Sequence, residues 1–234
     1  MGRHFEVRAA SMAKTAAQKS AVYMRASKEI YVAAKSGVPD PASNLALRAV
    51  IDKYRKTCPR DVIERAIKKA QGGDATNYIN GRYEAFGPGG SYIVIDTLSD
   101  NTNRALVNTR TIVTRRNGHM GSVLFNFEQV GLLDFLYKGT KDELEETLIL
   151  GDIDLKDSSL EDGVAEVVVN PSHFDKTKEV LKEIGIEEFE AAEITLLANE
   201  MITLEGEELT QFKDLIDALD DCEDVQAVYH NVSL

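Results

Sequence analysis

Apolar residues recur at a helical period along three segments at the start of the chain. The predicted helices span residues 11–36, 44–57 and 60–71. In the first, Tyr23, Ala26 and Ile30 share one side of the helix, and lysines and arginines occupy the other positions. Proline and glycine separate the three segments, which fits helix ends rather than one long helix. The pattern therefore predicts three helices that bury one small core and leave their cations outside.

The pattern changes after Gly81. Short apolar runs, which predict strands, now alternate with amphipathic segments, which predict helices. Expected strands lie at 91–98, 122–127, 132–137, 163–169, 188–197 and 225–232, and expected helices at 101–116, 142–150, 172–184 and 210–219. The polar stretch that ends at Asn80 is predicted to be a linker, and Gly131 is expected to interrupt a strand.

The predicted fold class is α+β. It comprises an N-terminal three-helix domain and two small α/β domains of the ferredoxin-like, βαβ type, one inserted into the other. The unit at 91–127 lacks elements to cover its sheet, and the helix and strand at 208–232 can supply them. The expected domains are a basic helical domain at 1–80, a discontinuous α/β domain at 81–131 and 205–234, and an inserted acidic α/β domain at 132–204.

Charge is distributed unevenly along the 234 residues, whose formal net charge is −12. Residues 1–80 hold 15 Lys and Arg against 7 Asp and Glu, a net +8, whereas residues 81–234 hold 12 against 32, a net −20. A basic head on an acidic body suggests a polyanionic partner for the head. Solubility alone is the plainer explanation of the same asymmetry.

The candidate nucleic-acid contacts are cations that lie off the apolar stripes of the three helices. They are Lys14, Lys19, Arg25, Lys28, Lys35, Arg48, Lys53, Arg55, Lys56, Arg60, Arg65, Lys68 and Lys69. A second polar cluster runs from Asp100 to Arg104, before a predicted helix. Asn and Asp in that position usually cap the helix. The functional alternative directs Asn101, Asn103, Arg104 and Arg110 toward phosphate.

Other classes of function find little support in the sequence. The four histidines and two cysteines have no metal-ligand spacing, and no nucleotide-binding or nucleophile motif is present. We therefore expect no catalytic residue, no metal and no cofactor. No apolar run approaches a membrane span and the N-terminus lacks a signal-peptide core, so a cytoplasmic location away from membranes is expected. No heptad seam is present, which favours a monomer.

Several motifs occur together in an order that resembles the YebC family of probable transcriptional regulators, which includes the mitochondrial translational activator of cytochrome oxidase subunit I. They are Pro39-Asp40-Pro41, the segment from Pro59 to Lys69, Phe86-Gly87-Pro88-Gly89-Gly90, Asp100-Asn101-Thr102-Asn103-Arg104 and Gly121-Ser122-Val123. The resemblance covers the whole chain. It implies a helical N-terminal domain, two α/β domains with one inserted in the other, and a nucleic-acid-associated protein without catalytic activity. The turn at 117–122 is shorter than the family's usual form.

The sequence thus favours a non-enzymatic regulator of gene expression that binds DNA through phosphate contacts. The main alternative places the same basic surface on ribosomal RNA, in a translation factor bound to the ribosome. The low aromatic content, 7%, argues against base stacking as the main mode of binding. An enzyme with a site in an acidic cleft and a protein-interaction adaptor are the remaining, weaker alternatives.

Overall fold

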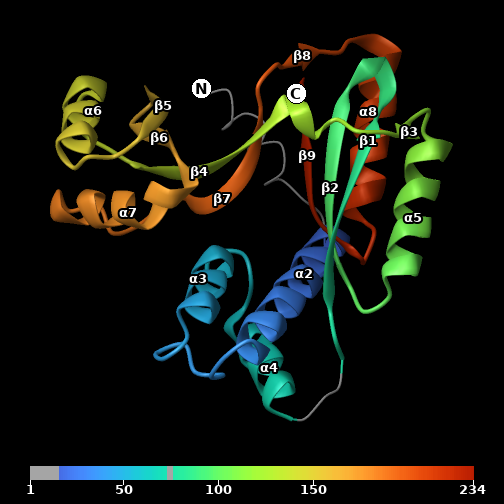
Figure 1. Cartoon of the computed structure of the whole chain (residues 1–234), viewed down its shortest axis with the longest axis horizontal. Coiled ribbons are helices and arrows are strands. Elements are labelled where there is room, and N and C mark those ends of the chain that lie inside the picture. Colours follow the sequence, from blue (N-terminus) through green and yellow to red (C-terminus); the bar gives the residue numbers. More distant parts are fainter. Residues whose placement is uncertain (1–15, 73–75) are drawn as a thin grey trace. The chain divides into compact units, whose positions relative to one another are not determined.

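The computed structural model describes residues 16–72 and 76–234 (Figure 1). The described residues form two compact units. The larger unit holds the helical head together with residues 76–126 and 200–232, and the smaller unit is formed by residues 127–199 with residues 233–234. The predicted α+β class is confirmed, whereas the predicted domain limits at 131/132 and 204/205 remain predictions.

The head consists of α2 (Ala16–Lys35), α3 (Leu45–Tyr54) and α4 (Arg60–Gln71), at or near the predicted positions. The predicted helix start at residue 11, and Lys14 with it, lie outside the described residues. Asn44 fixes the start of α3, because its Oδ1 accepts a hydrogen bond from the Leu47 amide at 3.0 Å. Its Nδ2 also donates to the Ala33 carbonyl at 2.9 Å, which joins α3 to the end of α2.

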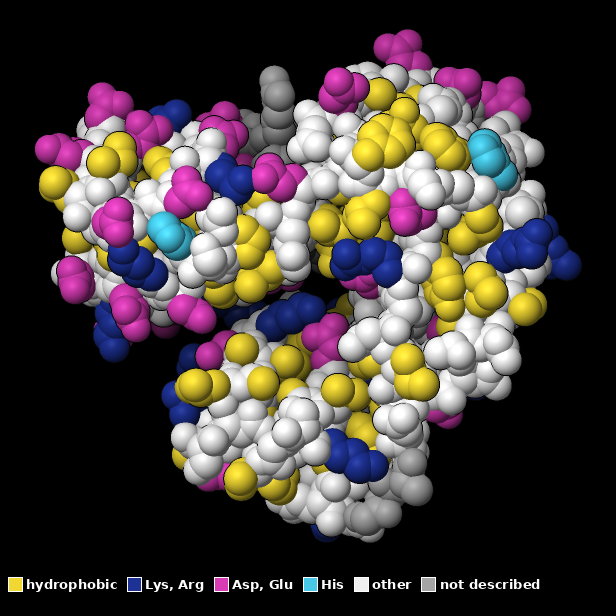
Figure 2. All heavy atoms as spheres, viewed as in Figure 1, with side chains coloured by type: hydrophobic (Ala, Val, Ile, Leu, Met, Phe, Trp, Pro, Cys, Tyr) yellow, Lys and Arg dark blue, Asp and Glu magenta, His cyan; other side chains and the backbone are white. Residues whose placement is uncertain are grey.

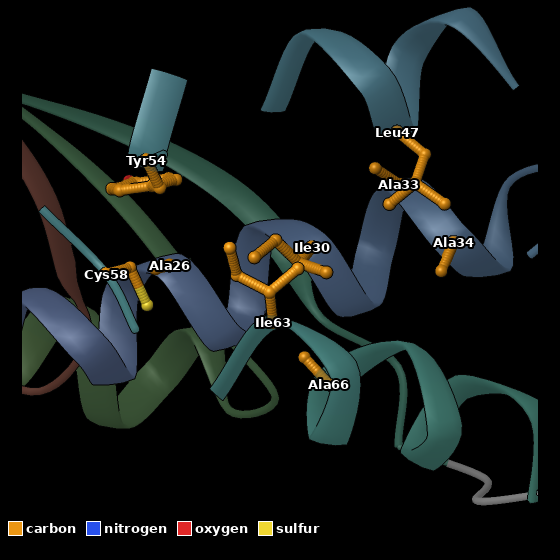
Figure 3. Packing of buried hydrophobic residues seen from close by; sticks show 9 residues of the cluster. All are labelled: Ala26, Ile30, Ala33, Ala34, Leu47, Tyr54, Cys58, Ile63 and Ala66. Carbon is orange, nitrogen blue, oxygen red and sulfur yellow. The ribbon is translucent and has the colours of Figure 1, made fainter. Parts of the chain in front are cut away.

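Small side chains let the three helices of the head approach closely (Figure 3). Ala26 and Ile30 of α2 are fully buried and belong to one cluster with Leu47 of α3 and Ile63 and Ala66 of α4. This is the core that the helical periodicity predicts. It leaves the opposite side of each helix to polar residues.

The larger unit also contains a four-stranded antiparallel sheet with strand order β3-β1-β2-β9. Its elements are β1 (Ile79–Phe86), β2 (Tyr92–Ser99), α5 (Thr102–Arg115), β3 (His119–Met120), α8 (Gly206–Asp220) and β9 (Val225–His230). Helices α5 and α8 contact each other and lie on the same side of the sheet (Figure 1). The short strands β8 (Ile202–Thr203) and β10 (Val232–Ser233) pair with each other in a separate two-stranded sheet.

The smaller unit has a second antiparallel sheet with order β5-β6-β4-β7. Its elements are β4 (Phe127–Leu136), α6 (Lys141–Leu150), β5 (Leu155–Glu161), β6 (Val164–Val169), α7 (Phe174–Glu183) and β7 (Ala191–Ala198). Each helix connects two parallel strands that have a third strand between them, which is the ferredoxin-like arrangement. Leu133, Phe135 and Val167 are buried beneath Leu144 and Leu148 of α6 and Leu181 of α7.

Four local predictions were wrong. The predicted linker up to Asn80 already contains the start of β1, and the polar strand β5 was not predicted. The strand predicted at 122–127 is instead a 3₁₀ turn, η2 (Leu124–Asn126), followed by β4. Gly131 does not interrupt β4. A Cβ there would lie 2.9 Å from the Phe174 ring, so the glycine allows a close approach inside a continuous strand.

Candidate nucleic-acid interface

The solvent side of α4 carries the densest group of predicted contacts. Ile63 and Ala66 face the core, so Arg60, Arg65 and Lys68 are exposed on the other side of the helix. Arg60 pairs with Glu64 at 2.8 Å and Arg65 with Asp61 at 2.5 Å, both one turn apart. Such exposed pairs contribute little, about 0.3–0.5 kcal/mol, and can exchange for a phosphate.

The second half of α4 is free of acidic residues. From Arg65 to Gln71 the sequence contains three cations and no Asp or Glu. Lys68 forms no ion pair with any of the residues that the structure describes. The Nζ of Lys69 lies 5.5 Å from the centroid of the Tyr31 ring, which ties this lysine to α2. The end of α4 therefore presents the charge of Lys68, which has no carboxylate partner among the residues that the structure describes.

The connection from α3 to α4 adds further cations. Arg55, Lys56 and Arg60 occur within six residues, and all three are exposed. The side chain of Arg55 makes no hydrogen bond or ion pair with the described part of the chain, and only its backbone amide is bonded, to the Asp52 carbonyl. Earlier in α3, Lys53 pairs with Glu29 at 3.0 Å, and Arg48 donates to the backbone carbonyls of residues 41 and 42. These last two cations stabilise the head itself.

The cations of α2 do not form one surface. Lys19 is exposed, without an ion pair to any described residue. Lys35 lies at the other end of the helix, where its Nζ donates to the Tyr31 hydroxyl at 2.8 Å and to the Thr76 carbonyl at 3.2 Å. Arg25 and Lys28, between these two ends, point toward the α/β part of the same unit.

Arg25 and Lys28 hold α2 against the end of α8 and the turn that follows it. The guanidinium of Arg25 donates to the carbonyl of Asp220 at 2.5 Å and to that of Val225 at 3.0 Å. The Nζ of Lys28 donates to the carbonyl of Glu223 at 2.5 Å. Cations at a helix C-terminus satisfy carbonyls that the helix leaves open and interact favourably with its dipole. The structure therefore uses these two predicted contacts for internal packing.

Arg104 also forms ion pairs within the protein. Its guanidinium donates two hydrogen bonds to the carboxylate of Asp224, at 2.7 and 3.1 Å, and one to Asp100 at 3.0 Å. The side chain of Asp224 is fully buried. Burial raises the pKa of Asp224, but hydrogen bonds from Arg104 and Ser99 outweigh it and hold the pKa below its ordinary value. The hydrogen bond to Asp224 in turn raises the pKa of Arg104.

The Asp100–Arg104 motif thus combines a cap with an ion pair. Asn101 caps α5, since its Oδ1 accepts the amide of Arg104 at 3.0 Å. Asn103 and Arg110 remain exposed on α5, and Arg110 has no ion pair within the described residues. Arg104 and Arg110 therefore lie in different environments and do not form the joint surface that the alternative interpretation requires.

Sequence reasoning missed the acidic partners of these cations. Asp220 and Asp224 are about 120 to 200 positions from Arg104 and Arg25, and nothing in their local sequence marks them as ion-pair partners. The position of Asp224 directly before a predicted strand is visible in the sequence, but by itself it does not identify an ion-pair partner. It becomes informative only once the sheet order places β9 next to β2.

The described residues offer no group of three or more His, Cys, Asp or Glu side chains arranged to hold a metal ion. Within residues 16–72 and 76–234, no helix is long and apolar enough to cross a membrane.

Comparison with known proteins places the chain in a family. A model described as the TACO1/YebC protein N-terminal domain matches residues 3–73, and a model of the TACO1/YebC second and third domain matches residues 78–232. The chain belongs to the TACO1/YebC family. The resemblance that the sequence motifs indicate is therefore confirmed, and the three-helix head corresponds to the family's N-terminal domain.

Two relatives of this TACO1/YebC protein show how far the similarity extends. The chain is 48% identical over 239 residues to the probable transcriptional regulatory protein Mfl546 of Mesoplasma florum, with all of both chains covered. It also resembles the crystal structure of a conserved hypothetical protein, Aq1575, from Aquifex aeolicus. That comparison has a TM-score of 0.76 at 29% identity and covers 94% of this chain and 92% of the other.

Proposed function

We propose that this TACO1/YebC protein is a non-enzymatic, nucleic-acid-binding regulator of gene expression that binds DNA through the head and acts in the cytoplasm as a monomer. The observation that carries the proposal is the solvent side of α4, where Arg65 and Lys68 are exposed in a segment without acidic residues. The description of the Mesoplasma florum relative as a probable transcriptional regulatory protein supports the regulatory part of the proposal.

Electrostatics explains why the head would make the contact. Neutralisation of phosphates by Lys and Arg releases counterions, which supplies most of the sequence-independent affinity. Residues 81–234 carry a net charge of −20 and would repel a polyanion. The acidic part of the chain therefore disfavours phosphate contacts over most of its surface, so the basic head is the main site for a duplex.

Exposed cations without a strong internal partner are the best candidates for the phosphate contacts. Arg55, Lys68 and Lys19 have no ion pair within the described residues, and Arg60 and Arg65 have only exposed pairs. We assign phosphate contact to these five cations. Arg25 and Lys28 are assigned to holding the head against the α/β part of the unit, and Arg104 to holding the start of α5 against the residue before β9.

The test is a pair of variants with equal changes in charge. R55E/K68E reverses two unpaired cations of the head, and K138E/K182E reverses two exposed lysines of the smaller unit. In fluorescence anisotropy titrations with duplex DNA, R55E/K68E should weaken binding of all sequences alike. The slope of log K against log salt should fall by about 2, because two phosphate contacts are lost. K138E/K182E should bind as the wild type does. An unchanged affinity and slope in R55E/K68E would remove this surface from the interface.

A second candidate function, translation regulation through ribosomal RNA, uses the same cations. Phosphate contacts do not distinguish duplex DNA from structured RNA. In-cell crosslinking, followed by sequencing of the recovered DNA and RNA, separates the two. Discrete promoter segments with RNA at background would support the transcriptional role. Ribosomal RNA from one locus with DNA at background would replace it with the translational one.

A further inference from the structure

Four aromatic rings form a continuous row on the larger unit. The ring of Phe125 in η2 lies 5.6 Å from that of Tyr92, which lies 5.5 Å from that of Phe86, both in edge-to-face contact. The Phe86 ring is stacked on the imidazole of His119 at 4.9 Å, with the planes 16° apart. The four residues come from β1, β2, β3 and the turn before β4, so the fold assembles the row from distant parts of the sequence.

The last ring of the row is exposed. Phe125 is 71% exposed, although a buried position would gain free energy from removing the ring from water. The exposure is not the result of a loose loop. The carboxylate of Glu84 accepts hydrogen bonds from the amides of Val123 and Leu124, both at 2.7 Å. Because Val123 is fully buried on one side of Phe125, the ring is held outward in a fixed place.

The turn is fixed on the other side of Phe125 as well. The side-chain amide of Asn126 donates to the carbonyl of Glu200 at 3.1 Å and accepts from the Glu200 amide at 3.1 Å. Asn126 is 5% exposed. Both neighbours of the exposed ring are thus anchored, and a ligand would meet a preformed surface.

Positive charge adjoins the other end of the row. His119 follows the end of α5, where Arg115 is exposed without an ion pair to the described residues and Arg116 pairs with Asp214 at 2.8 Å. Figure 2 shows hydrophobic side chains beside a histidine where β3 lies, with Lys and Arg side chains over α5 at the same edge. The exposed ring at one end of the row and the exposed guanidinium near the other match the two parts of a single strand that runs along the row, its flat bases and its charged backbone.

We propose that Phe125 is a stacking site for an unpaired base of a single-stranded nucleic acid that runs along the aromatic row, with Arg115 at the His119 end placed to contact the backbone of the same strand. This inference rests on the proposed function and narrows it, because a duplex offers no unstacked base to such a ring. The inference also modifies the expectation that a low aromatic content argues against base stacking. A whole-chain aromatic content of 7% does not prevent the fold from gathering four rings in one place.

The chain contains no tryptophan, so F125W creates a single fluorescent reporter at the site. Single-stranded oligonucleotides should quench the F125W emission, because a stacked base contacts the indole. The matched control is V107W, which places tryptophan at a position on α5 that is 60% exposed and outside the aromatic row. Its emission should stay unchanged. F125L keeps an apolar side chain without a ring and should bind the single strand at least about fivefold more weakly.

Three other results would each overturn the proposal that a base stacks on Phe125. If anisotropy shows binding but F125W and V107W respond alike, or F125L binds as the wild type does, base stacking at Phe125 is excluded and the head remains the binding surface. If neither single strands nor duplexes bind the wild type, the proposed function fails together with this site. A loss in F125L that is equal for duplex and single strand would also overturn the proposal.

Discussion

The guanidinium of Arg104 and the carboxylate of Asp224 form a bidentate pair that joins the start of α5 to the residue before β9. Bidentate pairs between arginine and a carboxylate have a defined geometry as well as a favourable energy. Asp224 is fully buried, and its backbone carbonyl accepts a hydrogen bond from the Leu98 amide at 2.9 Å. The Asp100–Arg104 motif of the family therefore has a structural explanation in this chain that requires no ligand.

Removal of Arg104 should destabilise the protein more than removal of a neighbouring arginine. R104A leaves the buried Asp224 carboxylate without its main partner, and we expect a loss of about 2–4 kcal/mol in the free energy of unfolding, measured by urea denaturation. R110A removes an exposed cation from the same helix and should change stability by less than about 0.5 kcal/mol. Equal midpoints for the two variants would show that the pair contributes nothing.

The same pair predicts an effect of acid. The pKa of Asp224 is lower in the folded protein than in the unfolded chain. Its contribution to stability is therefore complete above the unfolded pKa, about 3.9, and is lost as the pH falls through the folded value. The wild type should lose more stability below pH 4 than R104A does. Parallel curves of stability against pH for the two proteins would contradict this.

Arg25 should determine how firmly α2 is attached to the rest of the larger unit. Its side chain is 16% exposed and donates to the Asp220 and Val225 carbonyls. R25A leaves these carbonyls without a charged donor, at a cost of roughly 1.5–3 kcal/mol. Hydrogen exchange of the α2 amides should accelerate in R25A and stay unchanged in K19A, whose lysine is exposed on the same helix. Unchanged α2 protection in R25A would show that other contacts hold the helix.

Most of the fold follows from local sequence patterns. The three helices of the head and the helices α5 to α8 have clear periodicity, and Asn101 caps the start of α5, as the Asp100–Arg104 cluster predicts. Strand β1 was not predicted because its exposed face is polar: Arg82 pairs across the sheet with Asp96 at 2.6 Å. Such a pair stabilises a strand through its neighbour, and that neighbour is not visible in the local pattern.

The turn at 122–127 was mistaken for a strand for a related reason. Val123, Phe125 and Phe127 occupy every second position, as on one face of a strand, yet Val123 is fully buried and Phe125 is 71% exposed. The amides of Val123 and Leu124 bond to the Glu84 carboxylate instead of a neighbouring strand.

The candidate cations of the site could be listed from the sequence. Which of them stay exposed and which form internal hydrogen bonds or ion pairs depends on partners that only the folded chain brings near.

His230 makes stability depend on pH in a different range. Burial, mainly, lowers its pKa from 6.5 to about 4, and the imidazole lies against the Phe212 ring with a centroid distance of 5.1 Å. Between these two pH values the unfolded chain binds a proton that the folded protein excludes. Stability should therefore be highest above pH 6.5 and fall by about 3 kcal/mol on acidification to pH 4. H230Q should lose less over the same range, and equal losses in urea denaturation would exclude His230 as the cause.

Glu84 should control the exposed ring of Phe125. E84A leaves the amides of Val123 and Leu124 without their acceptor, so the turn should become mobile while the sheet persists through its backbone bonds. In the F125W background, time-resolved anisotropy should then show a faster local motion of the indole, and single strands should bind several-fold more weakly because the site is no longer preformed. E205A is the matched control, since this glutamate is exposed and has no ion pair within the described chain. If E84A leaves both the motion and the affinity unchanged, the anchoring of η2 by Glu84 does not determine how Phe125 is presented.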